Sequence, residues 1–192
     1  MKLKTLALLL VSAVFANAAP EPLFDGKTLD GWKVEGADYW QAKDGVIVGQ
    51  SDEKKQGSIL WTTAEYKDFV LETDFRFEGD VDSGIFLRSH NEQIQIGVSR
   101  SQKRDLTGSP YIGSKKGYPQ EAQGVAELLK DGEWNHFKIT VKGNVYTVEL
   151  NGTEVCEYVS DSAKKLEGPI GLQIHAGVVM GVDFRNITLS SL

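Results

Sequence analysis

Apolar and polar residues alternate along most of the chain, and this alternation is the pattern of β-strands that bury one face and expose the other. The longest alternating run covers residues 68–78. Its apolar side carries Phe69, Leu71, Phe75 and Phe77, with Thr73 among them. Shorter runs of the same kind recur across residues 40–98 and 135–190. The pattern predicts roughly ten or more strands.

Short turns separate the predicted strands. Typical hairpin turns are found at Asp44-Gly45, at Gly143-Asn144 and at Asn151-Gly152. Only residues 120–130 have a spacing that suits a helix, and that stretch is short. Many strands joined by short turns around one core predict an all-β fold, an antiparallel two-sheet sandwich. Without a repeat or a linker, residues 19–192 are expected to form a single β-sandwich domain.

The first 18 residues differ from the rest of the chain. Two lysines precede an apolar run, and Ala16-Asn17-Ala18 is a small-x-small cleavage site. We therefore expect residues 1–18 to be a secretory signal peptide, because the apolar run is too short to span a membrane. The single cysteine, Cys156, cannot form an internal disulfide, so an exported domain would depend on its core. Such a domain suits a bacterial periplasmic or secreted protein.

The net charge of −6 is spread along the chain without a large block of one sign, which argues against nucleic acid as a partner. Residues 99–133 interrupt the strand pattern and form a long, basic loop. A loop of this length in a compact domain is usually functional or disordered. It is therefore either a solvated basic loop or the rim of a binding site. Its notable side chains are Arg100, Lys103, Arg104, Tyr111, Lys115, Lys116 and Tyr118.

Four predicted strands carry polar groups on the side opposite their apolar residues. If these strands share a sheet, the combined face is rich in planar hydrogen-bonding groups, which suit the hydroxyls of a sugar. Trp40 and Trp61 would add a stacking surface, although large aromatic residues more often anchor the core of a sandwich. The residues on this side are Glu72, Asp74, Arg76, Gly84, Phe86, Arg88, Gln93, Gln95, Gln173 and His175.

Six stretches resemble one bacterial family, the 3-keto-disaccharide hydrolases, in their order and spacing. They are EPLFDGKTLDGWK, ILWTTAEYKDFVLETDFRF, DSGIFLRS, TGSPY, GEWNHFKITVKGNVYTVELNG and GPIGLQIHAGVVMGVDFRNITL. The resemblance covers essentially all of residues 19–192. It implies a jelly-roll sandwich of the concanavalin A-like lectin/glucanase type.

The resemblance also implies an exported enzyme that cleaves glycosides already oxidised to a ketone at C3. The expected ligand is then a small saccharide or an oxidised glycoside. A ketone at C3 acidifies the proton at C2, so elimination of the C1 substituent needs a base, a group that stabilises the developing oxyanion and an acid near the leaving group. A divalent metal ion is one group that can stabilise such an oxyanion.

We expect Asp74 and His175 to act as the base, or as metal ligands if a divalent ion takes part, with Glu72 in reserve on the same face as Asp74. Each has a plain structural alternative: an Asp–Arg ion pair for Asp74, and a histidine satisfied by polar neighbours for His175. Arg88 would contact the oxyanion or a hydroxyl, or else form a structural salt bridge with Asp74 or Glu72. The expected substrate-binding side chains are Arg88, Gln93, Gln95, Gln173, Trp61 and Tyr111. His90, just past Arg88 at a strand end, is expected at the surface, with a role as a second ligand as the alternative, and His136 receives no role.

The chain departs from the family pattern in residues 91–99. Many family members have a tyrosine–glutamate pair and an aspartate there, whereas this chain has Gln93, Gln95 and Val98. Glutamine cannot act as a base. Either Asp74 and His175 carry the catalysis, or the protein is a non-catalytic, lectin-like carbohydrate-binding module on the same fold.

An ordinary retaining glycosidase is the third hypothesis and ranks last. Glu72, Asp74 and Glu78 share one face, but Glu78 lies about 13 Å along a strand from Asp74. Retention requires two carboxyl groups about 5 Å apart.

Overall fold

The computed structural model describes residues 19–161 and 166–192. The predicted signal peptide, residues 1–18, lies outside the described residues. Within the described part of the chain, none of the helices has the length and apolar character needed to cross a membrane.

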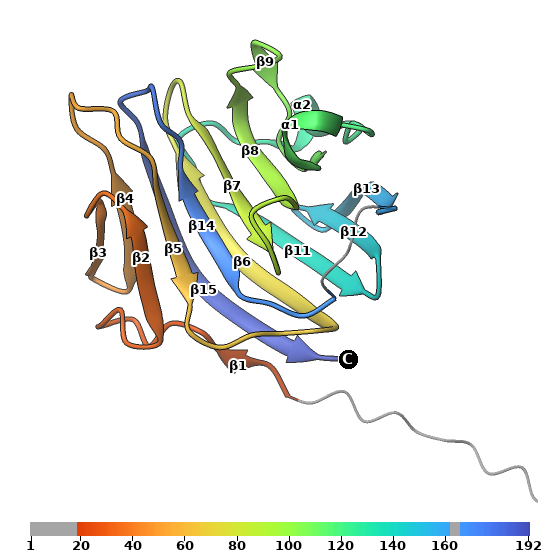
Figure 1. Cartoon of the computed structure of the whole chain (residues 1–192), viewed down its shortest axis with the longest axis horizontal. Coiled ribbons are helices and arrows are strands. Elements are labelled where there is room, and N and C mark those ends of the chain that lie inside the picture. Colours follow the sequence, from red (N-terminus) through yellow and green to blue (C-terminus); the bar gives the residue numbers. More distant parts are fainter. Residues whose placement is uncertain (1–18, 162–165) are drawn as a thin grey trace, which may run out of the picture.

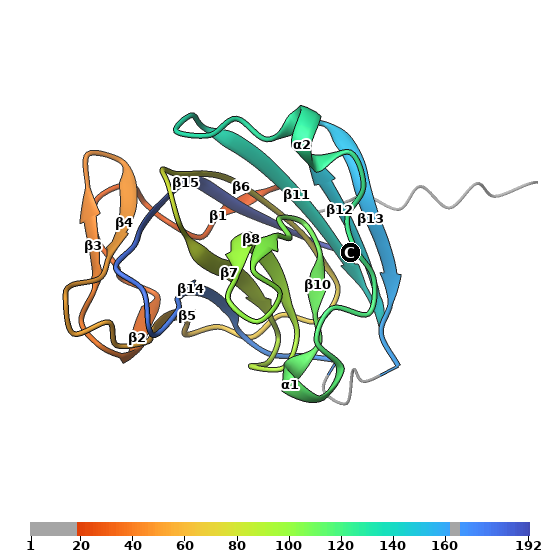
Figure 2. The same cartoon turned by 90° about the horizontal axis from the view of Figure 1, so that it is seen from above.

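Two antiparallel sheets pack face to face (Figures 1 and 2), as the alternating pattern predicts. The back sheet has the order β13 (Thr153–Val159), β12 (Val145–Leu150), β11 (Asn135–Lys142), β6 (Phe69–Phe77), β15 (Gly181–Ser191), β4 (Val46–Gln50) and β3 (Trp40–Lys43), with β1 (Glu21–Pro22) beside β15. The front sheet has the order β10 (Pro110–Tyr111), β8 (Gln93–Ser99), β7 (Asp82–Leu87), β14 (Ile170–Ile174), β5 (Ser58–Thr62) and β2 (Trp32–Gly36), with β9 (Arg104–Asp105) beside β8.

The core lies between the sheets and uses the apolar sides that the alternation predicts. On β6 the burial alternates residue by residue, and Phe69, Leu71, Phe75 and Phe77 point inward. Thr73 is also buried, and its hydroxyl donates to the carbonyl of Arg185 at an irregularity in β15. A buried carbonyl that leaves the sheet ladder needs such a donor, which explains the one polar residue on this side of β6.

The three predicted hairpins are present. Asp44 and Gly45 both have positive φ angles, 50° and 81°, and turn the chain from β3 into β4. The β11–β12 and β12–β13 turns hold Gly143-Asn144 and Asn151-Gly152. Asn151 and Gly152 also both have positive φ, whereas in the β11–β12 turn only Gly143 does. Both patterns occur in tight hairpin turns whose twist matches that of the strands.

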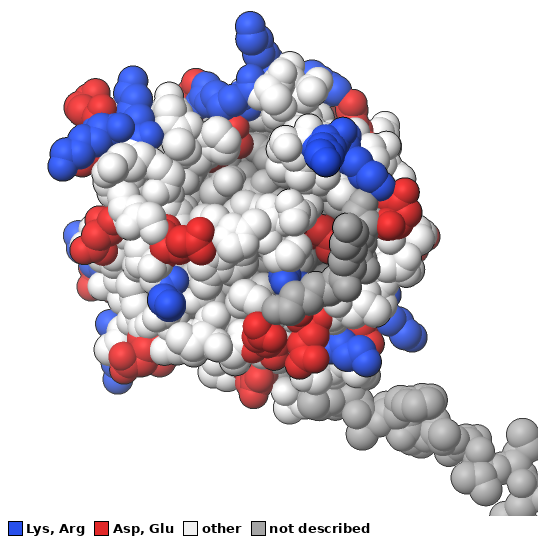
Figure 3. Space-filling model, viewed as in Figure 1, with Lys and Arg blue, Asp and Glu red and all other residues white. Residues whose placement is uncertain are grey.

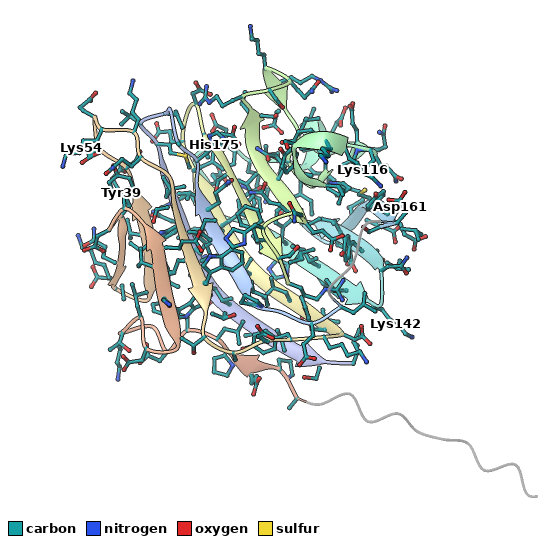
Figure 4. The ribbon with its side chains drawn as sticks, in the orientation of Figure 1. Tyr39, Lys54, Lys116, Lys142, Asp161 and His175 are labelled. Atoms are coloured by element: carbon teal, nitrogen blue, oxygen red, sulfur yellow. The ribbon has the colours of Figure 1, made fainter. Side chains whose placement is uncertain are left out.

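The helix expected over residues 120–130 is largely wrong. Only α2 (Val125–Leu128) is helical there, because Gly124 has a φ of 69° and no side chain caps the helix start. The long loop contains a second short helix, α1 (Gly113–Lys116). Lys116 forms an ion pair with Asp161 (Figure 4), which ties α1 to the chain that follows β13.

Cys156 lies buried on β13. Burial raises the pKa of its thiol to about 11, so the thiol is protonated at neutral pH. Since the thiolate is the reactive form, this cysteine is a core residue without a nucleophilic role.

Candidate functional site

The outer face of the front sheet is hollowed near its centre, and most charged side chains lie toward its rim (Figure 3). A cavity of about 280 Å³ lies there, over β8, β7 and β14. Strand alternation brings Asp82, Phe86, Gln93, Gln95 and Gln173 to this face, because each has the parity opposite to its buried apolar neighbours. Tyr111 of β10 also lines the cavity.

Two glycines make room for these side chains. A Cβ on Gly84 would lie 2.3 Å from the amide nitrogen of Gln93, and a Cβ on Gly171 would lie 2.6 Å from the ring of Trp61. Contacts this short do not occur between real atoms, so neither position can carry a side chain without moving its neighbour. Gly84 therefore leaves space for the amide of Gln93, and Gly171 leaves space for the ring of Trp61.

A hydrogen-bond network fixes the cavity floor. The amide of Gln95 donates to Asp82 at 2.8 Å, and the hydroxyl of Tyr118 donates to the Gln95 carbonyl at 2.8 Å. The backbone N–H of Arg100 donates to the other Asp82 oxygen at 2.9 Å. The side-chain amide of Gln93 donates to the side-chain oxygen Oε1 of Gln173 at 2.6 Å. The side-chain amides are thus held in one orientation toward any ligand.

Tyr118 remains a phenol at any physiological pH. Burial raises the pKa of its hydroxyl to about 12. Its ring lies 5.2 Å from that of Tyr111, so the long loop contributes two aromatic rings to one side of the cavity. Of the two interpretations of this loop, the structure favours the rim of a binding site, since Ser99, Arg100 and Ser101 also line the cavity.

His175 follows β14 at the upper end of that strand (Figure 4), and it lines the cavity. Its Nδ1 lies 2.6 Å from the carbonyl oxygen of Ala176, so this nitrogen carries the proton and donates it. The other ring nitrogen, Nε2, then has a free lone pair. A neutral imidazole held in this tautomer can accept a proton.

A second group of side chains extends the hollow toward β2. We call Glu35, Trp61 and His90 the shelf. Nε2 of His90 lies 3.1 Å from both carboxylate oxygens of Glu35, and the indole N–H of Trp61 donates to the same carboxylate at 3.0 Å. The imidazole of His90 is 4.7 Å from the ring of Trp61. Two further hollows lie beside the cavity, and Glu35 lines both of them. The hollow of about 320 Å³ shares His90 with the cavity, and the hollow of about 330 Å³ shares His175 with it. The three hollows therefore form one groove.

The structure does not bring Asp74 and Glu72 to this face. Both lie on β6 in the back sheet, on its outer side, so the expected common face with His175 is wrong. The alternation of β6 was interpreted correctly, but alternation does not show to which sheet a strand belongs. Glu72 lies 3.3 Å from Nε2 of His136, and Asp74 lies 2.9 Å from Nδ1 of the same ring.

Asp74 has a structural role in the back sheet. Burial alone would raise the pKa of its carboxyl, but hydrogen bonds from His136, Asn186 and Arg185 outweigh burial and hold the pKa below its usual value. A lowered pKa in the folded state adds stability above the unfolded-state pKa, and this contribution is lost as the pH falls through the folded-state pKa.

Asp74→Asn is therefore expected to lower the free energy of unfolding at pH 7 by about 1 kcal/mol, a modest value because the site is partly solvated. The difference from wild type should shrink as the pH falls below about 4, the usual pKa of aspartate. Urea unfolding at several pH values measures it, with the exposed Asp131→Asn as the control. A loss that does not change with pH would contradict the assignment.

Arg88 is not on the groove face either. It is 1 % exposed and lies in the turn between β7 and β8, where its φ of 64° directs the side chain into the core. Its guanidinium donates to the carbonyls of Lys67 and Leu166 and, at 3.0 Å, to the hydroxyl of Tyr146. The Tyr146 hydroxyl in turn donates to Glu92, which is also buried. The expected salt bridge with Asp74 or Glu72 is wrong as well.

Tyr111 lines the cavity, and Trp61 lies on the same face of the front sheet but is only 7 % exposed. Trp40 is the core residue that was expected. Sequence reasoning missed Asp82. This residue begins the strand that carries Gly84 and Phe86, and the two-residue period places all three on the same face. Sequence reasoning placed His90 at the surface, where the imidazole does lie, more than half exposed, but it did not predict a partner for it. The pairing of His90 with Glu35 joins residues far apart in the chain, and no sequence pattern signals it.

The residues do not fit a metal at His175 or Asp74. Among residues 19–161 and 166–192 there is no group of three or more His, Cys, Asp or Glu side chains that could hold a metal ion. The oxygens of Asp74 accept hydrogen bonds from His136, Arg185 and Asn186, and His175 lies on the other sheet.

A larger hollow, of about 440 Å³, lies at the back sheet. It is lined by Arg76 and Asp183, which form an ion pair at 2.6 Å. Its described lining includes no imidazole. The groove of the front sheet combines imidazoles, amides and aromatic rings, so we take it as the candidate site.

Comparisons with known proteins find relatives that are named for carbohydrate cleavage or carbohydrate binding. A family model described as the 3-keto-alpha-glucoside-1,2-lyase-like domain matches residues 19–190. A protein of Bacteroides thetaiotaomicron named 3-keto-disaccharide hydrolase is 25% identical over 166 residues, which cover 71% of this chain and 57% of that protein. The chain thus spans less than two thirds of the length of this relative.

Solved structures show the same fold. The crystal structure of a candidate glycosyl hydrolase from Parabacteroides distasonis has a TM-score of 0.70 and 27% sequence identity, and covers 91% of this chain and 100% of that one. The carbohydrate-binding module CBM66 of Bacillus subtilis has a TM-score of 0.59 and 18% identity, and covers 84% and 96% of the two chains. The second likeness shows the fold alone. The expected sandwich of lectin type is confirmed.

Proposed function

The chain belongs to the 3-keto-alpha-glucoside-1,2-lyase-like domain family, and from this premise we propose that it cleaves 3-keto-glycosides in the groove of the front sheet. The observation that carries the proposal is His175, a histidine whose tautomer leaves Nε2 free to accept a proton beside a cavity lined with amides. Gln93, Gln95 and Gln173 would orient the hydroxyls of the oxidised sugar.

The reaction follows from the acidity that the ketone gives to C2. Nε2 of His175 takes the C2 proton, and the electron pair of the C2–H bond forms the enolate at C2 and C3. The enolate then expels the C1 substituent, whose oxygen takes up a proton, and water adds to the unsaturated product. The developing negative charge needs a nearby cation. Arg100, which lines the cavity and whose guanidinium forms an ion pair with Asp80 at 2.9 Å, would be the cation in place of Arg88.

A binding module is the second candidate function. Both oxygens of Asp82 and the side chains of Gln93 and Gln95 are already engaged in hydrogen bonds with the protein. A fixed polar floor of this kind suits recognition of a sugar without turnover. The likeness to CBM66 shows that the fold also occurs in a protein named for carbohydrate binding.

We expect the protein to release nitrophenol from nitrophenyl 3-keto-glucoside but not from the unoxidised glucoside. Elimination needs the acidic C2 proton that only the ketone provides. A chelator should leave the rate unchanged, because the groove residues do not fit a metal. The absorbance of the released nitrophenolate measures both reactions.

Release from the unoxidised glucoside would instead support a glycosidase. No release from either compound, with sugar binding detected by calorimetry, would favour the binding module. A rate lost on chelation would contradict the assignment of the proton transfer to His175 alone.

A further inference from the structure

Hydrogen bonds and ring packing hold the three side chains of the shelf in place. The indole N–H of Trp61 and Nε2 of His90 converge on one carboxylate, that of Glu35, at 3.0 and 3.1 Å. The ring of Trp61 is 7 % exposed and packs 5.4 Å from Phe86. The histidine and the glutamate remain more than half exposed. A buried aromatic ring thus supports a polar pair that faces the groove.

The shelf and the amide-lined cavity are parts of one groove. His90 lines the cavity and also the hollow over Trp61, while His175 lines the cavity and the hollow beside Glu35. In the sheet, Gln173 pairs with Ile59, and Ile59 pairs with Glu35. Glu35 is therefore two strands from Gln173, about 10 Å away. A ligand of two sugar rings can occupy both parts at once, whereas a single ring cannot.

The two histidines are oriented differently. In His175, which lines the cavity, the carbonyl of Ala176 binds Nδ1, which leaves Nε2 without a proton. In His90 the carboxylate of Glu35 binds Nε2, so that this nitrogen carries a proton. Among the described residues Nδ1 of His90 has no hydrogen-bond partner. A protonated imidazole held in this way can donate from Nδ1.

We propose that the shelf is the subsite for the leaving group and that His90 gives the leaving oxygen its proton. The inference rests on the proposed function. As the C1–O bond breaks, the Nδ1 proton of the His90 imidazolium passes to the aglycone oxygen, and His90 becomes neutral. His175 meanwhile holds the proton from C2, and exchange with water restores both histidines. The occupant is a second sugar ring, because the exposed carboxylate of Glu35 can accept hydrogen bonds from its hydroxyls, and the hollow of about 320 Å³ beside it has room for a ring.

Leaving-group dependence tests the role of His90. A poor leaving group such as glucose or methanol needs protonation, whereas nitrophenol does not. His90→Gln is therefore expected to lower kcat/KM about a hundredfold for a 3-keto-disaccharide and for methyl 3-keto-glucoside, and less than about threefold for the nitrophenyl compound. An equal loss on all three substrates would mark a merely structural role and overturn the assignment.

Binding without turnover tests the subsite separately. By calorimetry, an unoxidised glucose disaccharide should bind about tenfold more tightly than methyl glucoside. Glu35→Gln should remove this difference, and Glu154→Gln, an exposed glutamate of the back sheet, should preserve it. If no 3-keto substrate is turned over but the preference for the disaccharide persists, the proposed function fails and the subsite stands. If turnover occurs without the preference and without leaving-group dependence, the inference fails.

Discussion

Replacing His175 by alanine is expected to lower kcat for the 3-keto-glucoside by about a thousandfold, because general-base catalysis by a positioned histidine contributes about 10²–10⁴-fold. Tm should stay within a few degrees of wild type. The imidazole is half-buried, and its hydrogen bond goes to the next residue, Ala176, so its loss opens no cavity in the core. Stopped assays of nitrophenol release, together with a thermal scan of the same preparation, measure both quantities.

His136→Ala provides the matched control. His136 lies on the outer face of the back sheet between Glu72 and Asp74, so its loss should affect stability and spare turnover. Retained activity in the His175 variant would assign the base to another group of the groove. A large fall in Tm for that variant would show that His175 is a structural residue.

Replacing Arg88 by methionine is expected to lower the free energy of unfolding by about 3–5 kcal/mol, since removal of one partner leaves a buried charge uncompensated. The Glu92 carboxylate, 3 % exposed, would then lie in the core without the guanidinium that reaches it through Tyr146. The carbonyls of Lys67 and Leu166 would also lose their donor. For a domain of this size the change corresponds to a fall in Tm of roughly 10 °C.

A double-mutant cycle separates charge from packing. Arg88→Met combined with Glu92→Gln removes both buried charges, so the double variant should lose less than the sum of the two single losses. Strict additivity would contradict the coupling between Arg88 and Glu92. Turnover of the 3-keto-glucoside should persist in every variant that folds, since neither Arg88 nor Glu92 lines the groove.

The sequence predicted the strands well because the rule behind them is local. Alternation in residues 69–77 and 170–174 follows from the two-residue period of a strand, and the structure confirms which side is buried. The same rule brought Gln93, Gln95, Gln173 and His175 to one face, and these four residues do meet there.

Topology decided the rest of the site. Asp74 has the predicted parity, but β6 pairs with β11 and β15 in the back sheet, and local periodicity contains no information on pairing partners. At Arg88 the period itself fails, because a left-handed φ reverses the direction of the side chain. The groove depends on contacts between Glu35, Trp61 and His90, which come from three separate segments.

The buried thiol of Cys156 makes this protein convenient for spectroscopy. It is the single cysteine of the chain, and in the folded state it is shielded and protonated. A cysteine introduced at Ser101, on the rim of the cavity, would therefore be the one thiol that a maleimide dye reaches in the native protein. Ligand entry could then be followed by the emission of a single probe, with the native cysteine left in place.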